Sequence, residues 1–188
     1  MDFPLNSLGI THKFMAERIK KGSVCIDATA GKGRDTVFLC SLVGETGKVT
    51  AFDIQQSAVL QTKELIMQKG YGNIAEVFYD SHENMGNYFA KETVDAIMFN
   101  LGWLPGGDHN IFSKPTSTIK AINTGLELLK PGGVMSVCIY HGKETGTAEK
   151  DALLPFFKTI DNLKYTVIKL DFTNRTGEIP IPVLIIKE

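Results

Sequence analysis

Residues 26–39, IDATAGKGRDTVFL, decide the fold of this chain. An apolar run ends at Asp27, small residues and two glycines follow, and apolar residues then recur with helical spacing. A buried strand that turns through glycines into a helix is typical of α/β sheets that bind nucleotides. Because ligands of such sheets lie beyond the carboxyl ends of the strands, we expect a ligand at this turn.

Strands and helices alternate along the rest of the chain. The expected strands are residues 24–28, 48–53, 75–79, 94–100, 134–140, 164–172 and 182–186, and the expected helices are residues 12–21, 35–43, 55–69, 118–129 and 148–160. This alternation predicts a doubly wound sheet, and the turn-rich segment 173–180 predicts that the last two strands pair antiparallel at its edge. The expected fold class is α/β: one domain over residues 1–188, with a mostly parallel seven-stranded sheet and an antiparallel C-terminal strand.

Composition narrows the class of protein. A chain of 188 residues with 43% hydrophobic and 22% charged residues is typical of a soluble globular protein with one core. The formal net charge of −1 means that a nucleic-acid partner needs a local basic patch. Cys25, Cys40 and Cys138 lie far apart in apolar runs, which indicates neither a disulfide framework nor a metal site. From these cysteines we expect a cytoplasmic protein with no metal. We expect no membrane partner, because the sequence shows no signal peptide or spanning segment.

Three kinds of ligand compete for the glycine turn. A phosphate-binding P-loop would need a glycine at Ile26, and Gly33 follows Lys32 where that motif has serine or threonine. A dinucleotide fingerprint is incomplete, because Thr36 stands at its third glycine. S-adenosylmethionine (SAM) has no pyrophosphate and does not need that glycine, and its cationic sulfonium favours nearby carboxylates. The turn therefore favours SAM, with NAD as the weaker alternative.

Acidic residues follow three successive expected strands, and this series supports the same choice. Asp27 suits the cation of SAM, Asp53 suits its ribose hydroxyls, and Asp80 lies beside Ser81 and His82, which can flank an adenine. A role in a turn or a helix cap explains each acid singly, but it does not explain why an acid follows each of three successive strands. The expected cofactor-binding residues are Asp27, Ala30, Gly31, Gly33, Asp35, Thr36, Asp53, Gln55, Asp80, Ser81, His82 and Asn100.

Three segments together resemble one known family. Residues 26–39, 99–109 (FNLGWLPGGDH) and 139–153 (IYHGKETGTAEKDAL) look like small bacterial class I methyltransferases, long labelled rRNA methylases, and the resemblance covers nearly the whole chain. The family is now associated with the tRNA wobble uridine. The resemblance implies a Rossmann-like fold and SAM-dependent conversion of 5-aminomethyl-(2-thio)uridine to its methylaminomethyl form. Lys32 and Arg34 replace asparagines usual in the family, so no side-chain contact is carried over at these two positions.

The catalytic candidates follow the fourth and fifth expected strands. Asn100 falls where amino-methylating enzymes place a polar residue. Its side-chain oxygen, or the backbone carbonyls of Asn100 and Leu101, can accept hydrogen bonds from an amine. His141 and Asp108 are the leading candidates for the group that takes the proton of that amine. Trp103, in a glycine-rich loop, can stack on a splayed-out base or simply pack over the loop.

Basic residues near the first expected helix suggest an RNA partner. Lys20 and Lys21 are expected to contact the anticodon region of tRNA, where single-stranded bases need only a modest basic patch. Ordinary solvated lysines would look the same in the sequence. A homodimer, an rRNA substrate, an NAD-dependent oxidoreductase and a non-catalytic SAM-binding module stay open as alternatives.

Overall fold

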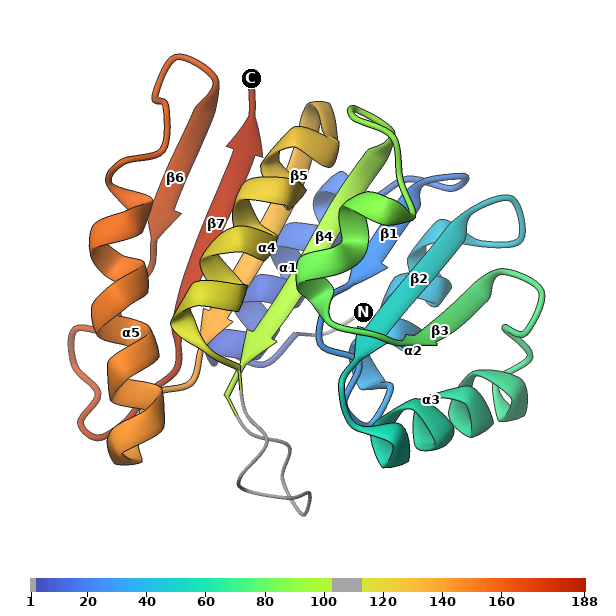
Figure 1. The fold of residues 1–188 in the computed structure, drawn as a ribbon, viewed down its shortest axis with the longest axis horizontal. Coiled ribbons are helices and arrows are strands. Elements are labelled where there is room, and N and C mark those ends of the chain that lie inside the picture. Colours follow the sequence, from blue (N-terminus) through green and yellow to red (C-terminus); the bar gives the residue numbers. More distant parts are fainter. Residues whose placement is uncertain (1–2, 103–112) are drawn as a thin grey trace.

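The computed structural model describes residues 3–102 and 113–188, whose strands form one sheet in the order β3-β2-β1-β4-β5-β7-β6 (Figure 1). The strands are β1 (Val24–Asp27), β2 (Lys48–Asp53), β3 (Ala75–Tyr79), β4 (Val94–Leu101), β5 (Leu129–Ile139), β6 (Tyr165–Lys169) and β7 (Ile181–Lys187). The first five strands run parallel, while β7 is antiparallel to both β5 and β6. The expected α/β class and the antiparallel terminal pair are confirmed, and the antiparallel strand itself lies one place in from the edge.

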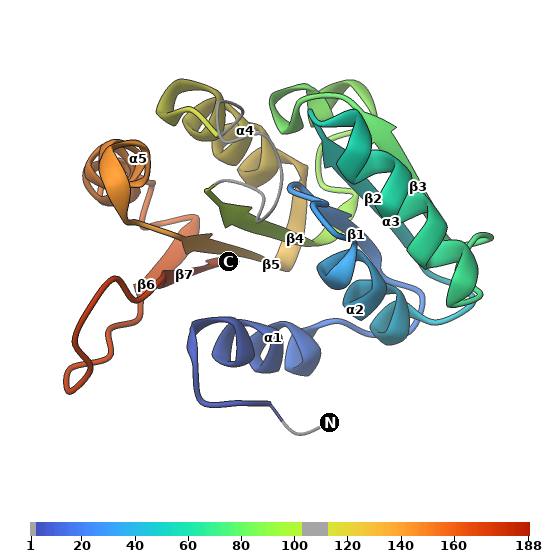
Figure 2. The same cartoon turned by 90° about the horizontal axis from the view of Figure 1, so that it is seen from below.

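Helices cover both faces of this sheet. They are α1 (Ser7–Arg18), α2 (Arg34–Val43), α3 (Gln56–Gln68), the 3₁₀ helix η1 (His82–Asn87), α4 (Pro115–Leu128) and α5 (Lys143–Phe157). Successive side chains of a strand point to opposite faces, so Ile97 packs with the α4 and α5 layer while Ala96 packs with the α1, α2 and α3 layer. Figure 2 shows α4 and α5 on one side of the sheet and α1 and α2 on the other. Strands buried on both faces explain the near-continuous apolar runs in the sequence.

Several elements differ from the sequence prediction. Helix α5 spans Lys143–Phe157 where residues 148–160 were expected, and β6 spans Tyr165–Lys169 where residues 164–172 were expected. Helix α1 begins at Ser7 and ends at Arg18, because the side chain of Asn6 accepts a hydrogen bond from the Gly9 amide at 2.8 Å and caps the helix five residues earlier than expected. Strand β5 begins at Leu129, five residues before its expected start, and α4 spans Pro115–Leu128 where residues 118–129 were expected. The 3₁₀ helix η1 was not expected, and Ser81 caps it.

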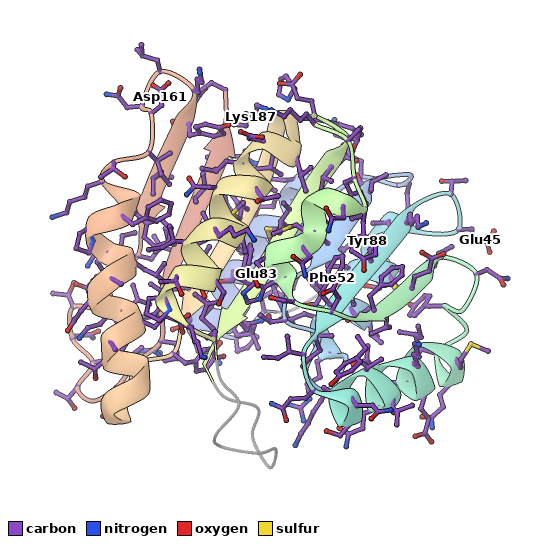
Figure 3. All side chains as sticks on the ribbon, viewed as in Figure 1. Glu45, Phe52, Glu83, Tyr88, Asp161 and Lys187 are labelled. Atoms are coloured by element: carbon purple, nitrogen blue, oxygen red, sulfur yellow. The ribbon has the colours of Figure 1, made fainter. Side chains whose placement is uncertain are left out.

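The strand order places a crevice above the middle of the sheet. From β1 the chain adds β2 and β3 on one side and then crosses to add β4 and β5 on the other. Ligands bind at such a reversal, beyond the carboxyl ends of the strands. Beside it, Phe52 at the end of β2 packs against Tyr88 with ring centroids 5.1 Å apart (Figure 3). None of the helices in residues 3–102 and 113–188 combines the length and apolar character needed to cross a membrane.

Candidate active site

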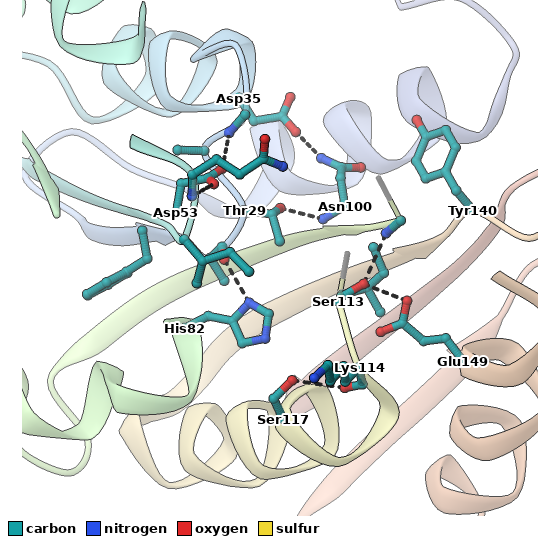
Figure 4. Close-up of a pocket in the computed structure, with 18 of the residues that line it drawn as sticks. Thr29, Asp35, Asp53, His82, Asn100, Ser113, Lys114, Ser117, Tyr140 and Glu149 are labelled. Atoms are coloured by element: carbon teal, nitrogen blue, oxygen red, sulfur yellow. Dashed lines mark hydrogen bonds between the residues drawn. The ribbon is translucent and has the colours of Figure 1, made fainter. Parts of the chain in front are cut away.

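A cavity of about 820 Å³ lies at this crevice (Figure 4). One part of its wall comes from the glycine turn after β1 and from the residues that follow β2 and β3. The other part comes from the ends of β4 and β5, the start of α4, and α5. Of the residues expected to bind cofactor, those on the wall are Ala30, Gly31, Asp35, Asp53, Gln55, Asp80, Ser81, His82 and Asn100. The cavity therefore brings together most of the residues that were predicted from separate motifs.

The glycine turn has backbone angles that would be strained for any other residue type. Gly31 and Gly33 have φ angles of 53° and 76°, in the left-handed region that glycine adopts without penalty. A β-carbon on Gly33 would lie 3.1 Å from Thr62 of α3, and the Thr62 hydroxyl donates to the Gly31 carbonyl at 3.2 Å. The turn thus packs closely on α3 and presents its backbone to the cavity.

Asp53 ties the turn to the end of β2. Its two carboxylate oxygens accept hydrogen bonds from the amides of Gly31 and Gln55, both at 2.8 Å. Each oxygen keeps a further lone pair that can accept a hydroxyl hydrogen. The expected ribose contact therefore fits the position of Asp53, which also lines the cavity.

Asp27, Gly33 and Thr36 were expected to bind cofactor, but the structure does not place them on the cavity wall. The Asp27 side chain is fully buried, and its carboxylate accepts hydrogen bonds from the Thr36 hydroxyl at 2.6 Å and the Thr29 amide at 3.1 Å. Burial, with the nearby Asp35 carboxylate, raises the pKa of Asp27 to about 7. These residues hold the turn from beneath, because the Asp27 side chain points into α2 and not toward the crevice.

The residues after β3 offer a wall for a heterocycle. Asp80 accepts hydrogen bonds from the side chains of Asn84 and Tyr88, both at 2.8 Å. These bonds lower the pKa of Asp80, and the bond from Asn84 has the larger effect. His82 lies closer to the turn: its Nδ1 donates to the Ala28 carbonyl at 3.1 Å, and burial lowers its pKa. The neutral ring then presents Nε2 as an acceptor, and this buried atom has no partner among the described residues.

These features fit SAM. An acceptor without a partner at His82 Nε2 matches the amino group of an adenine, and Asp53 has lone pairs left for a ribose. The glycine backbone, which carries no β-carbon, allows close approach of a ligand to the turn. The cavity volume also lies within the range of about 300–1,000 Å³ that is typical of small-molecule sites.

Asn100 lies on the other part of the wall, and its side-chain amide is oriented by a chain of contacts. Its Nδ2 donates to Asp35, whose other carboxylate oxygen is 2.7 Å from His12 Nε2. The His12 ring in turn stacks on Phe38 with centroids 3.9 Å apart. Because a carboxylate only accepts, the NH₂ of Asn100 must face Asp35, and Oδ1 must point away from it. That oxygen is buried and has no hydrogen-bond partner among the described residues.

Glu149 of α5 was not among the predicted site residues, and the structure places it on the same wall. Its carboxylate accepts hydrogen bonds from the hydroxyls of Ser113 and Thr118, both at 2.7 Å. Burial raises its pKa, against the lowering effect of these two donors. The acid lies within the segment 139–153, but nothing in the sequence indicated that the side chain at 149 would turn inward.

The remaining predicted residues divide into three groups. His141 and Leu101 line the cavity, with His141 Nε2 2.8 Å from the Ile179 carbonyl. The Leu101 carbonyl, an expected acceptor for the amine, already accepts from the Tyr140 amide at 3.1 Å. Trp103 and Asp108 lie outside the described residues, so their predicted roles stay predictions.

Lys20 and Lys21 form the third group, and the structure does not bring them to the cavity. They precede β1, and Lys21 Nζ donates to the Ser41 carbonyl at 3.2 Å near the end of α2. A four-residue strand spans about 13 Å at roughly 3.3 Å per residue. Because the cavity lies at the far end of that strand, the basic residues on its wall are instead Lys32, Arg34 and Lys114.

Comparisons with known proteins point to one family of methyltransferases. The family model described as "Putative rRNA methylase" matches residues 49–186. A crystal structure from Clostridium thermocellum, described as a "putative rRNA-methylase", is 42% identical with a TM-score of 0.96, covering 98% of this chain and 99% of that one. A "putative methyltransferase" from Streptococcus mutans in complex with SAH is 34% identical with a TM-score of 0.88, covering 98% and 99%.

A curated relative from Arabidopsis thaliana is named "tRNA (mnm(5)s(2)U34)-methyltransferase, chloroplastic". It is 31% identical over 175 residues, which cover 88% of this chain and 64% of that protein, so the chain spans just under two thirds of its length. Since the family model covers most of the chain and the cavity fits the cofactor, this chain belongs to the rRNA methylase family of SAM-dependent methyltransferases.

Proposed function

We propose that this protein transfers the methyl group of SAM to the amine of 5-aminomethyl-(2-thio)uridine at the wobble position of tRNA. The Arabidopsis relative, whose name gives the methylated form of that nucleoside, supports the substrate class. The observation that carries the proposal is Asn100 Oδ1, a buried acceptor without a partner among the described residues, on the wall of the cavity. An amine is a hydrogen-bond donor that satisfies such an oxygen.

The chain's own residues orient the reaction. SAM supplies a methyl group on a positively charged sulfur, which needs no further activation. Asn100 accepts one hydrogen bond from the amine and so directs its lone pair, while Asp35 and His12 keep the amide from rotating. Holding two reactants in the reactive geometry is worth several kcal/mol of the barrier. Asn100 is thus a catalytic residue, and Asp35 and His12 are positioning residues.

Basic residues at the mouth of the cavity suit an RNA backbone. Lys32, Arg34 and Lys114 all lie on its wall, and the Lys114 side chain is exposed. In tRNA the wobble nucleotide lies in a single-stranded loop, so its base can be splayed into a cavity while phosphates remain outside. The partner is then the anticodon region of a tRNA. As a separate point, the buried free cysteines are in keeping with a cytoplasmic enzyme.

The test is methyl transfer from labelled SAM to three RNAs under one set of conditions. The first is tRNA that carries the aminomethyl wobble uridine, the second is the same tRNA without that amine, and the third is rRNA. We expect label only in the first, because the nucleophile exists only there. Equal labelling of the amine-free tRNA would remove the amine from the reaction, and preferential labelling of rRNA would support the activity in the family's description.

A further inference from the structure

Glu149 holds a buried negative charge on the cavity wall. The residue is 1% exposed, and its two oxygens accept hydrogen bonds from Ser113 and Thr118. No described cation pairs with it within 4 Å. Neutral hydroxyl donors offset only part of the cost of burying a carboxylate, and such charges are normally paired. A cationic ligand of the cavity would therefore supply the counter-charge for Glu149.

The position of this carboxylate is on the acceptor side. The Ser113 hydroxyl that donates to Glu149 also accepts a hydrogen bond from the Gly102 amide at 3.2 Å, two residues after Asn100 (Figure 4). Helix α5 approaches the end of β5 closely, since a β-carbon on Gly146 would lie 2.9 Å from the Tyr140 carbonyl oxygen. Glu149 is thus joined to the Asn100 segment by two hydrogen bonds, away from the glycine turn.

An aminomethyl group supplies the missing charge. A primary alkyl amine has a pKa of about 10, so it reaches the cavity as an ammonium ion. Only the neutral amine has a lone pair that can attack a methyl group. An ammonium needs a carboxylate first as a counter-ion and then as a proton acceptor, and Glu149 can serve as both.

We propose that Glu149 binds the ammonium form of the acceptor and removes its proton before methyl transfer, an inference that rests on the proposed function. In this step one N–H bond of the ammonium breaks, and its electron pair stays on nitrogen as the attacking lone pair. The proton forms an O–H bond with a carboxylate oxygen of Glu149. It is returned to solvent after the product leaves, since the methylated amine again carries one positive charge.

The burial of Glu149 suits this role. Burial raises its pKa toward that of the amine, which makes the proton transfer less uphill than it would be to an ordinary carboxylate. On its own helix Lys150 is 3.7 Å from Asp151, so that ammonium already has a partner. The other charged or titratable side chains on the described wall near this part of the cavity are Lys114, Tyr140, His141 and Glu178.

Two other described groups are less suited to take the proton. Asp35 already holds Asn100 and His12. The Ile179 carbonyl accepts a hydrogen bond from His141 Nε2, and an imidazole, unlike a carboxylate, carries no negative charge to counter an ammonium. Glu149 could also serve only to join α4 to α5, but a structural link of that kind would leave the pH dependence of the reaction unchanged.

The experiment measures single-turnover methyl transfer to aminomethyl tRNA at saturating SAM and tRNA, from pH 6 to 9.5. We expect Glu149→Gln to lower the rate at pH 7 by about 10²–10⁴-fold. Its rate should then rise about tenfold per pH unit toward the pKa of the amine, because only amine deprotonated by solvent reacts. The matched control is Asp151→Asn, which removes an exposed carboxylate from the same helix and should keep the wild-type profile.

A binding measurement supplies a readout apart from turnover. In the presence of S-adenosylhomocysteine, the wild-type protein should bind aminomethyl tRNA more tightly than the amine-free tRNA, and Glu149→Gln should abolish most of that preference. If Glu149→Gln does not fold, Ser113→Ala removes one donor to the carboxylate. The pKa of Glu149 should then rise, and the inflection of the rate profile should move to higher pH.

The outcomes separate this inference from the proposed function. Three results would overturn the role of Glu149 and leave the function standing. They are a wild-type pH profile in Glu149→Gln, an unmoved inflection in Ser113→Ala, or a rate that rises tenfold per pH unit in His141→Gln but not in Glu149→Gln. Failure of the wild-type protein to methylate aminomethyl tRNA at any pH would overturn both.

Discussion

Replacing Asn100 by alanine should separate chemistry from cofactor binding. The substitution removes Oδ1, the acceptor assigned to the amine, while Asp35 keeps its 2.7 Å contact with His12. A hydrogen bond to a charged group contributes about 1.5–3 kcal/mol. At about 1.4 kcal/mol per tenfold change, turnover should fall roughly 10- to 150-fold. The affinity for SAM should change little, because the cofactor contacts assigned here are to the turn, Asp53 and His82.

The assay pairs two measurements on one protein sample. Single-turnover methyl transfer to aminomethyl tRNA gives the rate at saturation, and calorimetric titration gives the affinity for SAM. Asn84→Ala is the matched control, since Asn84 holds the carboxylate of Asp80 on the cavity wall but does not itself line the cavity. A mutant that loses SAM affinity but keeps its turnover at saturation would place Asn100 in the cofactor site and refute the reasoning.

Three further predictions concern the turn, the RNA and pH. Asp53→Ala should weaken binding of both SAM and S-adenosylhomocysteine, measured by calorimetry, because it removes the oxygens assigned to the ribose hydroxyls, which also accept from the Gly31 amide at 2.8 Å; unchanged affinity would exclude the ribose contact. Lys114→Gln should weaken tRNA binding and reduce its salt slope by about one, whereas Lys21→Gln, at the opposite end of the strands, should do neither; the reverse pattern would place the RNA at that opposite end. Burial raises the pKa of Asp27 to about 7 from an unfolded value of about 3.9, so ionisation of this group opposes folding as pH rises through that range. The stability of Asp27→Asn relative to wild type, measured by urea unfolding, should therefore rise between about pH 4 and pH 7 and stay level above that range, and a pH-independent difference would contradict the assignment.

The sheet and the glycine turn could be predicted because their signals are local. Alternating apolar runs, glycines after a strand and acids at strand ends all lie within a few residues of one another. The start of α1 was missed although Asn6 was visible, because a single cap is a weak signal beside the periodic residues that follow it.

The site was harder, because its deciding contacts join residues far apart in the chain. Asp35 and Asn100 are separated by 65 residues, and the Glu149 carboxylate meets Ser113 and Thr118 from another helix. Sequence spacing carries no signal for such pairs. Sequence proximity also misleads: Lys21 and Lys32 look like one patch in the sequence, but β1 between them sends them to opposite ends of the sheet.

The most direct test of the central claim compares the modified nucleosides of tRNA from cells with and without the gene. Loss of the protein should abolish 5-methylaminomethyl-(2-thio)uridine and cause its aminomethyl precursor to accumulate, and the wild-type gene should restore the product. A gene carrying Asn100→Ala should restore it poorly. An unchanged tRNA profile together with a missing methyl group in rRNA would contradict the account and assign the enzyme to a different RNA.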